Sequence, residues 1–345
     1  MSTRIAINGF GRIGRAFMRV AHAHPELEVV AINDLGDAGQ FAYLLKYDTV
    51  YGRAPFSVEV GEKMLKVDGK EVKIVSEADP TKLPWKDLNI DVVVESTGLF
   101  TSYEKAKAHI DAGAKRVVIT APVKDEPPEG IAGATILVGL NDDKFQGVQI
   151  TSNASCTTNA SSPLMQILHE AIGIEKAVLS TTHGYTASQN LVDGPVKRAK
   201  GKEDYRDGRA GAHNIVPSST GAAIAVTKAI PDLTGKFDGI SLRVPVIAGS
   251  IADVTFIAKR DTSVEEVNEV LKKAATDERW KPVFAVTEEP LVSSDILGES
   301  HASIADLAMT RVIGGNLVKV LAWYDNEMGY THALVEHVVR LAKYI

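Results

Sequence analysis

A glycine-rich segment near the start of this 345-residue chain constrains its fold more than any other feature. The segment Asn8–Arg15 reads NGFGRIGR. Its glycines follow the order G-x-G-x-x-G, at Gly9, Gly11 and Gly14. The pattern predicts a strand over Arg4–Asn8 and a helix from Ile13 to about His22, so the glycines fall at the turn between them. We therefore expect a strand–turn–helix unit that binds the pyrophosphate of a dinucleotide, although the glycines alone also fit a turn that only packs helix on sheet.

An acidic residue supports the dinucleotide interpretation. The next predicted strand, Glu28–Asn33, is followed by Asp34, which lies about 20 residues after Gly14. That is the spacing of the carboxylate that holds a ribose in dinucleotide-binding folds. Because a carboxylate repels a 2′-phosphate, the sequence favours NAD over NADP.

Apolar runs separated by helical stretches continue through the first half of the chain. Such runs are typical of a parallel sheet buried on both faces. Turn signals within 57–75 indicate short antiparallel excursions. The further predicted strands are 91–95, 116–120 and 135–138, with a helix over 102–112.

The pattern changes after Asn153, where we place the domain boundary, since a chain of this length normally forms two domains. The second half mixes helices with alternating strands, and strands 239–247 and 250–260 are expected to pair antiparallel. The fold class is therefore α/β: a Rossmann-type dinucleotide-binding domain, then an α+β domain with a mostly antiparallel sheet. The other predicted elements are helices 155–171, 219–230, 262–276 and 326–345, a strand 176–185 and a long loop 186–212.

Composition narrows the functional classes. One cysteine excludes an internal disulfide framework and any multi-cysteine metal site, which fits a reducing compartment or a secreted protein without bridges. The N-terminus has no apolar signal region and no run approaches the length of a membrane span, so we expect a soluble, cytoplasmic protein. A net charge of −6 gives no global attraction to nucleic acid. The basic run 196–202 is followed at once by Glu203 and Asp204 and is interpreted as a solvated loop.

The single cysteine, Cys156, lies in the polar segment SNASCTTN at 152–159. Lone cysteines are often small buried hydrophobes. This one falls at the predicted start of a helix capped by Ser155 or Asn153, where the helix dipole is expected to lower the thiol pKa. The position makes Cys156 a candidate nucleophile.

A nucleophilic cysteine needs a base and, for a phosphorylated substrate, anion-binding groups. Of nine histidines, His183 is the best candidate base, because it lies where an apolar strand opens into a loop. Thr186 and the segment 218–221 offer hydroxyl and backbone N–H groups, while Arg243 within a strand fits either an anion site or a structural salt bridge. A dinucleotide fold, a thiol, a base and anion donors together indicate oxidation of a phosphorylated aldehyde through a covalent thiohemiacetal.

With these residues in place, the chain closely resembles the glyceraldehyde-3-phosphate dehydrogenase family over essentially its whole length. SNASCTTN is the most specific of the shared segments. The others are INGFGRIGR (7–15), INDL (32–35), LKYDT (45–49), ESTGLF (95–100), AGAKRVVIT (112–120), YRDGR (205–209), PSSTGAA (217–223), RVP (243–245) and WYDNEMGY (323–330). The resemblance implies an NAD-binding domain of residues 1–154 and 326–345, a catalytic domain of residues 155–325, a homotetramer, and a place in glycolysis or gluconeogenesis.

The resemblance also implies roles for individual residues. Cys156 is the expected nucleophile and His183 its base. The implied cofactor contacts are the three glycines together with Arg12, Ile13, Asp34, Thr120 and Asn326. The implied contacts of substrate phosphate and inorganic phosphate are Ser155, Thr157, Thr186, Thr220, Gly221 and Arg243. In the implied mechanism, thiolate attack and hydride transfer to NAD give a thioester, which phosphate cleaves to an acyl phosphate, with the Cys156 N–H and the His183 ring facing the oxyanion.

Two departures and three alternatives accompany the resemblance. Ala78 stands where the family usually has a basic residue, and the loop 193–209 is several residues longer than the common form. One alternative is erythrose-4-phosphate dehydrogenase, which shares the cysteine and the histidine. The second is a catalytically idle NAD- or RNA-binding protein of the same fold. The third is a phosphate-independent thiol aldehyde dehydrogenase, which the two anion sites disfavour.

Overall fold

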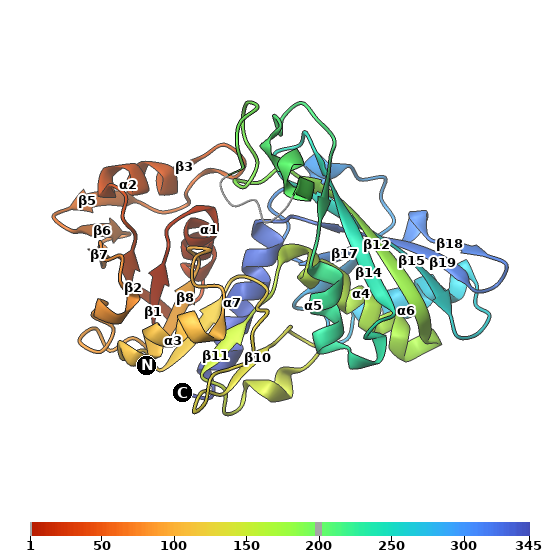
Figure 1. Ribbon diagram of the computed structural model, residues 1–345, viewed down its shortest axis with the longest axis horizontal. Coiled ribbons are helices and arrows are strands. Elements are labelled where there is room, and N and C mark those ends of the chain that lie inside the picture. Colours follow the sequence, from red (N-terminus) through yellow and green to blue (C-terminus); the bar gives the residue numbers. More distant parts are fainter. Residues whose placement is uncertain (1, 197–201) are drawn as a thin grey trace. The chain divides into compact units, whose positions relative to one another are not determined.

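The chain divides into two compact units. A computed structural model describes residues 2–196 and 202–345 (Figure 1). The first unit contains 1–137, 141–154 and 334–345, and the second contains 138–140 and 155–333. The sequence pattern placed one boundary after residue 153, and the resemblance implied boundaries after residue 154 and before residue 326. The basic run predicted at 196–202 lies almost entirely outside the described residues.

The first unit is built on a nine-stranded sheet. Its strand order is β10-β11-β9-β8-β1-β2-β7-β6-β5, parallel from β10 to β7 and antiparallel at the β7-β6-β5 edge. This confirms the predicted parallel sheet and its antiparallel excursion. The strands are β1 (Thr3–Asn8), β2 (Leu27–Asn33), β5 (Val58–Gly61), β6 (Met64–Val67), β7 (Lys70–Val75), β8 (Val92–Glu95), β9 (Arg116–Ile119), β10 (Gly133–Thr135) and β11 (Ile150–Ser152).

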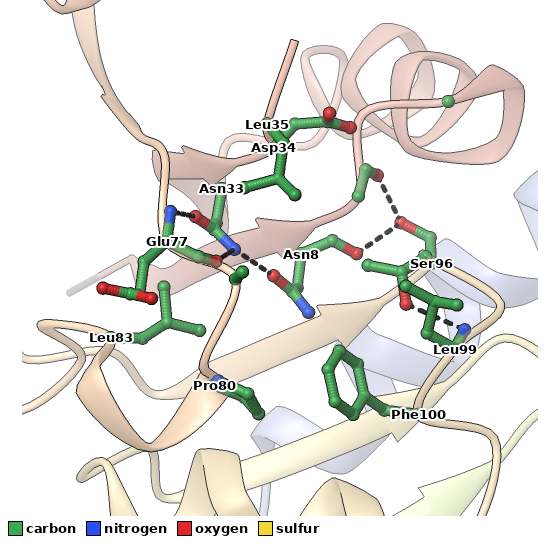
Figure 2. Close-up of a pocket in the computed structure, with 14 residues that line it drawn as sticks. Asn8, Asn33, Asp34, Leu35, Glu77, Pro80, Leu83, Ser96, Leu99 and Phe100 are labelled. Atoms are coloured by element: carbon green, nitrogen blue, oxygen red, sulfur yellow. Dashed lines mark hydrogen bonds between the residues drawn. The ribbon is translucent and has the colours of Figure 1, made fainter.

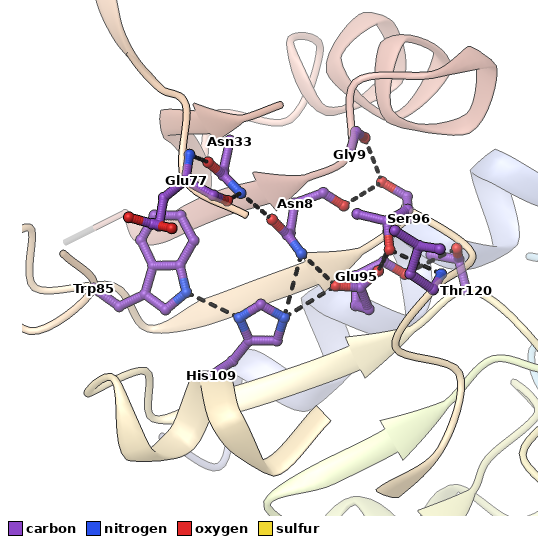
Figure 3. A network of polar contacts seen from close by, with 11 residues as sticks. Asn8, Gly9, Asn33, Glu77, Trp85, Glu95, Ser96, His109 and Thr120 are labelled. Atoms are coloured by element: carbon purple, nitrogen blue, oxygen red, sulfur yellow. Dashed lines mark hydrogen bonds and ion pairs between the residues drawn. The ribbon is translucent and has the colours of Figure 1, made fainter. Parts of the chain in front are cut away.

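Helices cover both faces of this sheet. The side chains of β8 are therefore buried along its whole length. Helices α1 (Arg12–Ala21) and α3 (Tyr103–Asp111) lie on opposite sides of it (Figures 1 and 3). The α3 side packs Tyr103 and Ala106 against Ala6 and Val93. A helix that the sequence did not predict, α2 (Ala38–Lys46), begins at Asp37, whose side chain accepts a hydrogen bond from Gln40 N.

The second unit contains an eight-stranded, mostly antiparallel sheet, as expected. Its order is β13-β14-β12-β15-β19-β17-β16, with β18 paired to β19; only β12–β14 and β16–β17 are parallel. The strands are β12 (Ile174–Gly184), β13 (Val216–Ser219), β14 (Phe237–Val244), β15 (Ser250–Ala258), β16 (Phe284–Thr287), β17 (Ser303–Asp306), β18 (Arg311–Ile313) and β19 (Leu317–Tyr324).

Three helices pack on one face of this second sheet. They are α4 (Cys156–Ile172), α5 (Ala222–Ala229) and α6 (Val264–Ala275) (Figure 1). Their apolar side chains share one core with the inward residues of β12, β15 and β19. Along β15 buried and half-buried residues alternate, which fits a sheet whose opposite face is not covered by a helix in the described part of the chain. The last helix, α7 (Met328–Ala342), contributes to both units.

The remaining elements are short. The strands β3 (Tyr47–Asp48) and β4 (Gly52–Arg53) form a separate antiparallel pair. The 3-10 turns are Pro80–Lys82, Asp142–Phe145, Lys202–Gly208, Pro231–Leu233, Ser293–Ile296 and Leu307–Met309. No helix in the described parts of the chain has the length and apolar character needed to cross a bilayer.

Two strand predictions are wrong. Strands β14 and β15 do not pair with each other, because β12 lies between them, parallel to β14 and antiparallel to β15. The prediction was wrong because it assumed that strands adjacent in the sequence pair with each other. The strand predicted at 135–138 is β10 at Gly133–Thr135, since Ile136 and the residues after it leave the sheet.

Candidate active site

A cavity of ≈ 280 Å³ opens in the first unit at the carboxyl ends of β1, β2 and β8 (Figure 2). The chain leaves β1 toward β2 on one side, whereas β8 lies on the other side of β1. Ligands of open α/β sheets bind in such a crevice. The lining residues are Asn8, Gly9, Gly11, Asn33, Asp34, Leu35, Glu77, Ala78, Pro80, Leu83, Ser96, Thr97, Leu99 and Phe100.

The three predicted glycines shape one end of this cavity. Gly9 has φ +94°, and a Cβ there would lie 2.6 Å from Thr97 N. A Cβ on Gly14 would lie 2.2 Å from Gly9 O, so this glycine allows the close approach of helix and turn. By contrast, a Cβ on Gly11 would meet no atom within 4 Å, and Gly11 precedes α1 without a side-chain cap. Backbone N–H groups at an uncapped helix start fit the pyrophosphate of a dinucleotide.

Acidic groups define the other end of the cavity. The Asp34 carboxylate accepts hydrogen bonds from Phe10 N at 2.7 Å and Gly36 N at 3.1 Å, which fix its orientation. Glu77 also lines the cavity, and none of the described lysines or arginines does. This charge pattern suits a ribose diol and opposes a 2′-phosphate. Ala78, where the family pattern has a basic residue, lies in this wall.

The other residues predicted to contact the cofactor have local partners. The Arg12 guanidinium forms an ion pair with Asp48 at 3.1 Å. Ile13 lies next to it on α1. The Thr120 hydroxyl donates to Glu95 O at 3.0 Å. Asn326, in the second unit, accepts from Gly249 N at 3.1 Å and Ser250 Oγ at 2.8 Å through its side-chain oxygen.

The second unit brings the predicted thiol and base together. Helix α4 begins at Cys156, and the hydroxyl of Ser155 caps it by accepting from Thr158 N. Cys156 Sγ lies 3.4 Å from His183 Nε2. Strands β12 and β14 are parallel with His183 opposite Arg243, so both side chains project from the same face of the sheet. Arg243 Nη1 lies 2.6 Å from His183 Nδ1.

Burial and charge set the protonation of this group. Burial, with Arg243 as the second cause, lowers the pKa of His183 to about 3. Burial raises the pKa of the Cys156 thiol, against the opposing effects of Arg243 and the Thr157 N–H. The prediction of a lowered thiol pKa is therefore wrong in direction, because loss of solvation outweighs the helix start. At neutral pH the pair is a thiol beside a neutral imidazole.

Tyr324 is a site residue to which the sequence interpretation assigned no role. Its hydroxyl lies 2.9 Å from Thr157 Oγ1 and 2.8 Å from Thr181 Oγ1, and its ring meets His183 edge-on. Thr157 follows the cysteine in α4 and Thr181 precedes the histidine in β12, so Tyr324 joins the two elements that carry the reactive pair. The only sequence signal was its place in the shared segment WYDNEMGY.

The remaining predicted anion contacts have partners close by. The hydroxyls of Ser155 and Thr157 bond to Thr158 and Tyr324. Thr186 Oγ1 lies 2.9 Å from Ser188 Oγ, and Thr220 Oγ1 accepts from Ala222 N at 3.2 Å. Gly221 precedes α5 with no side-chain cap, and a Cβ there would meet nothing within 4 Å. Within residues 2–196 and 202–345, no cluster of three or more His, Cys, Asp or Glu side chains has the arrangement of a metal site.

Comparison with known proteins identifies the family. Residues 3–103 match the model described as glyceraldehyde 3-phosphate dehydrogenase, NAD binding domain, and residues 155–326 match the C-terminal domain of the same family. The chain belongs to the glyceraldehyde-3-phosphate dehydrogenase family. NAD is therefore its cofactor, which agrees with the open space at Gly11 and the carboxylate of Asp34.

Full-length relatives agree with this family assignment. The glyceraldehyde-3-phosphate dehydrogenase of Thermotoga maritima is 49% identical over 99% of both chains. That of Clostridium acetobutylicum is 47% identical over 99% of this chain and 98% of the relative. The Geobacillus stearothermophilus enzyme is 46% identical over 100% of this chain and 98% of its own. The matches extend over the whole chain, which is therefore an NAD-dependent oxidoreductase. They favour neither of two alternatives, erythrose-4-phosphate dehydrogenase and a catalytically idle binding protein.

Proposed function

We propose that this chain oxidises D-glyceraldehyde 3-phosphate with NAD and inorganic phosphate to 1,3-bisphosphoglycerate, as a step of glycolysis or gluconeogenesis. The observation that carries the proposal is the contact of 3.4 Å between Cys156 Sγ and His183 Nε2, beside Arg243 and at the start of a helix. A phosphorylated aldehyde supplies the electrophile for the thiol and the anion for the guanidinium.

The first step joins the thiol to the aldehyde. His183 is neutral at physiological pH, so Nε2 accepts the Sγ proton as sulfur attacks the carbonyl carbon. The same nitrogen returns the proton to the carbonyl oxygen, which gives a thiohemiacetal on Cys156. The Cys156 N–H and the His183 ring stabilise negative charge on that oxygen during the attack.

The second step is the oxidation. NAD, when bound, supplies the hydride acceptor. As the C–H bond breaks, His183 Nε2 takes the hydroxyl proton, and the electron pair of the O–H bond forms the carbonyl of a thioester on Cys156. The Gly184 carbonyl, 2.7 Å from Nδ1, stabilises the resulting imidazolium.

The third step releases the acyl group. A phosphate oxygen attacks the thioester carbonyl, the C–S bond breaks, and Cys156 leaves as a thiolate that takes the proton from Nε2 of the His183 imidazolium, which restores the neutral ring. Arg243 holds one anion by charge, and Thr220, whose Oγ1 already accepts from Ala222 N, has its O–H left to donate. The proposed anion contacts in full are Ser155, Thr157, Thr186, Thr220, Gly221 and Arg243.

For the cofactor, the proposed contacts are Gly9, Gly11, Arg12, Ile13, Gly14, Asp34, Thr120 and Asn326. The side-chain oxygen of Asn326 is engaged by Ser250 and Gly249, which leaves its NH₂ group to donate to a ligand. Asp34 supports a preference for NAD over NADP. We further propose that residues 1–154 and 326–345 act as the NAD-binding domain and residues 155–325 as the catalytic domain.

The proposed oligomer is a homotetramer. The outward face of the eight-stranded sheet supports it, because no helix among the described residues covers this face, and Val178 and Ile240 on it are exposed by 56% and 53%. Large apolar side chains on a sheet face are usual at contacts between subunits. A cytoplasmic location remains a prediction from the sequence.

One assay tests the proposed reaction. NAD reduction is measured with glyceraldehyde 3-phosphate in the presence and absence of phosphate or arsenate. We expect turnover only with one of these anions. Rapid turnover without either anion would support the phosphate-independent alternative instead. Faster reduction with erythrose 4-phosphate would change the substrate assignment, and equal use of NADP would contradict the role of Asp34.

A further inference from the structure

Two walls of the NAD cavity are held by buried polar side chains, Asn33, which lines the cavity, and Glu95, which does not. One wall is the segment 77–80, whose backbone forms two hydrogen bonds with the Asn33 side chain (Figure 2). Asn33 Nδ2 donates to Glu77 O at 3.0 Å, and Glu77 N donates to Asn33 Oδ1 at 2.9 Å. The other wall is the segment 96–100. Its Thr97 donates to Glu95 Oε1 from both N and Oγ1, at 2.9 and 2.5 Å.

A chain of buried polar groups connects these two walls (Figure 3). Asn33 Nδ2 donates to Asn8 Oδ1 at 2.7 Å, and Asn8 Nδ2 donates to Glu95 Oε2 at 2.5 Å. Glu95 is 2% exposed and has no arginine or lysine among its contacts in the described residues. Its burial therefore depends on the donors around it, since an unsatisfied buried carboxylate is costly.

His109 on α3 completes the set of donors. Its Nε2 lies 3.0 Å from Glu95 Oε2, and Trp85 Nε1 donates to its Nδ1 at 3.1 Å. An indole nitrogen is only a donor, so Nδ1 carries a lone pair and Nε2 carries the proton. Asn8 Nδ2 also lies 3.4 Å from Nε2, but its short bond goes to Glu95. Trp85 thereby fixes His109 as a donor to Glu95.

We propose that His109 is a positioning residue for NAD, which acts through Glu95, Asn8 and Asn33 to set the spacing of the two cavity walls. His109 itself does not line the cavity, and the network reaches the cavity at Asn8, Asn33 and Thr97. Because Asp34 lies in the same cavity, the part of NAD affected is the adenosine half. The proposal concerns binding of the cofactor and does not depend on the thiol chemistry proposed above.

The test measures the Kd of NAD and of ADP-ribose directly, with no turnover required. His109→Leu removes the donor from a buried carboxylate, and we expect both Kd values to rise about 10-fold. His109→Gln restores an amide donor, and we expect a rise of about 3-fold or less. Trp85→Phe keeps an aromatic ring but removes the N–H that donates to His109 Nδ1, and we expect an intermediate rise of both Kd values, of about 5-fold.

A second buried histidine in the same unit provides a matched control. His337 is fully buried, as His109 is, and lies 2.7 Å from Thr151 Oγ1, with no part in the cavity lining. His337→Leu is expected to lower Tm to an extent comparable with His109→Leu but to leave both Kd values within about 2-fold.

The proposal is overturned if His109→Leu and Trp85→Phe lower Tm with unchanged Kd values, because the network would then be structural only. If His109→Leu fails to fold, His109→Gln and Trp85→Phe decide, and unchanged Kd values in both overturn it. Wild-type chain that binds NAD but does not turn over would contradict the proposed reaction alone.

Discussion

His183 and His109 are both buried, yet their surroundings differ in one respect that decides what each can do. His109 Nδ1 has one partner, the Trp85 N–H, so its tautomer is settled. His183 Nδ1 lies close to both a donor, Arg243 Nη1 at 2.6 Å, and an acceptor, Gly184 O at 2.7 Å. One nitrogen cannot donate to the carbonyl and accept from the guanidinium at the same time.

This difference separates a structural histidine from a reactive one. A proton on His183 Nδ1 leaves the Nε2 lone pair directed at Cys156, whereas a proton on Nε2 makes the ring a donor to sulfur. In the proposed mechanism Nδ1 keeps its proton, which it donates to Gly184 O, while Nε2 gains a proton to form the imidazolium and loses it again in each turnover. His109 is restricted to one neutral tautomer, because a proton on its Nδ1 would point at the indole N–H of Trp85.

The largest expected effect comes from removing the partner that makes His183 reactive. Cys156→Ser replaces the thiol by a hydroxyl that is a much weaker nucleophile, and we expect kcat to fall by about 10³-fold or more. Binding of NAD, measured by fluorescence quenching, should stay within about 2-fold of wild type. Substantial activity in this variant would contradict the assignment of Cys156 as the nucleophile.

The next effect tests the histidine itself. His183→Gln keeps a polar side chain but loses the basic nitrogen, so we expect kcat to fall by about 10²-fold or more. Rate-against-pH curves measured for variant and wild type should differ in shape, since a base has been removed. His337→Gln is the control for a buried histidine outside the site, and its kcat should be unchanged. Equal losses in the two variants would mean that His183 acts only through stability.

The sequence predicted a role for His183 but none for His109. The glycine spacing and Asp34 predicted the cavity because they depend on local turn geometry, and the position of Cys156 at a helix start followed from Ser155. The contacts of Tyr324 and His109 could not be predicted, because they join residues 14 to 167 positions apart. The direction of the thiol pKa was wrong for the same reason: a sequence gives the helix dipole but not the depth of burial.

The pH dependence of stability provides a third test. Burial lowers the pKa of His183 and His337 to about 3, below the ordinary value of 6.5. Between these values the unfolded chain binds more protons than the folded one, so stability falls as pH falls from 6.5 toward 3. At about pH 5 each histidine is expected to cost roughly 2 kcal/mol relative to about pH 7.5. Urea unfolding of His337→Gln should show a smaller loss than wild type; an equal loss would mean that His337 is not kept neutral by burial.

The smallest expected effect tests how His183 is held beside the thiol. Tyr324→Phe removes one hydroxyl and leaves Thr157 and Thr181 each without a partner across the α4–β12 contact. We expect a loss of about 1–2 kcal/mol in the free energy of unfolding and a modest fall in kcat, of about 5-fold, with little change in KM for NAD. The fall in kcat is the informative part, because the ring remains to pack against His183 and only the alignment of the two elements is altered. A variant that is destabilised but turns over at the wild-type rate would show that the geometry of the Cys156–His183 pair does not depend on Tyr324.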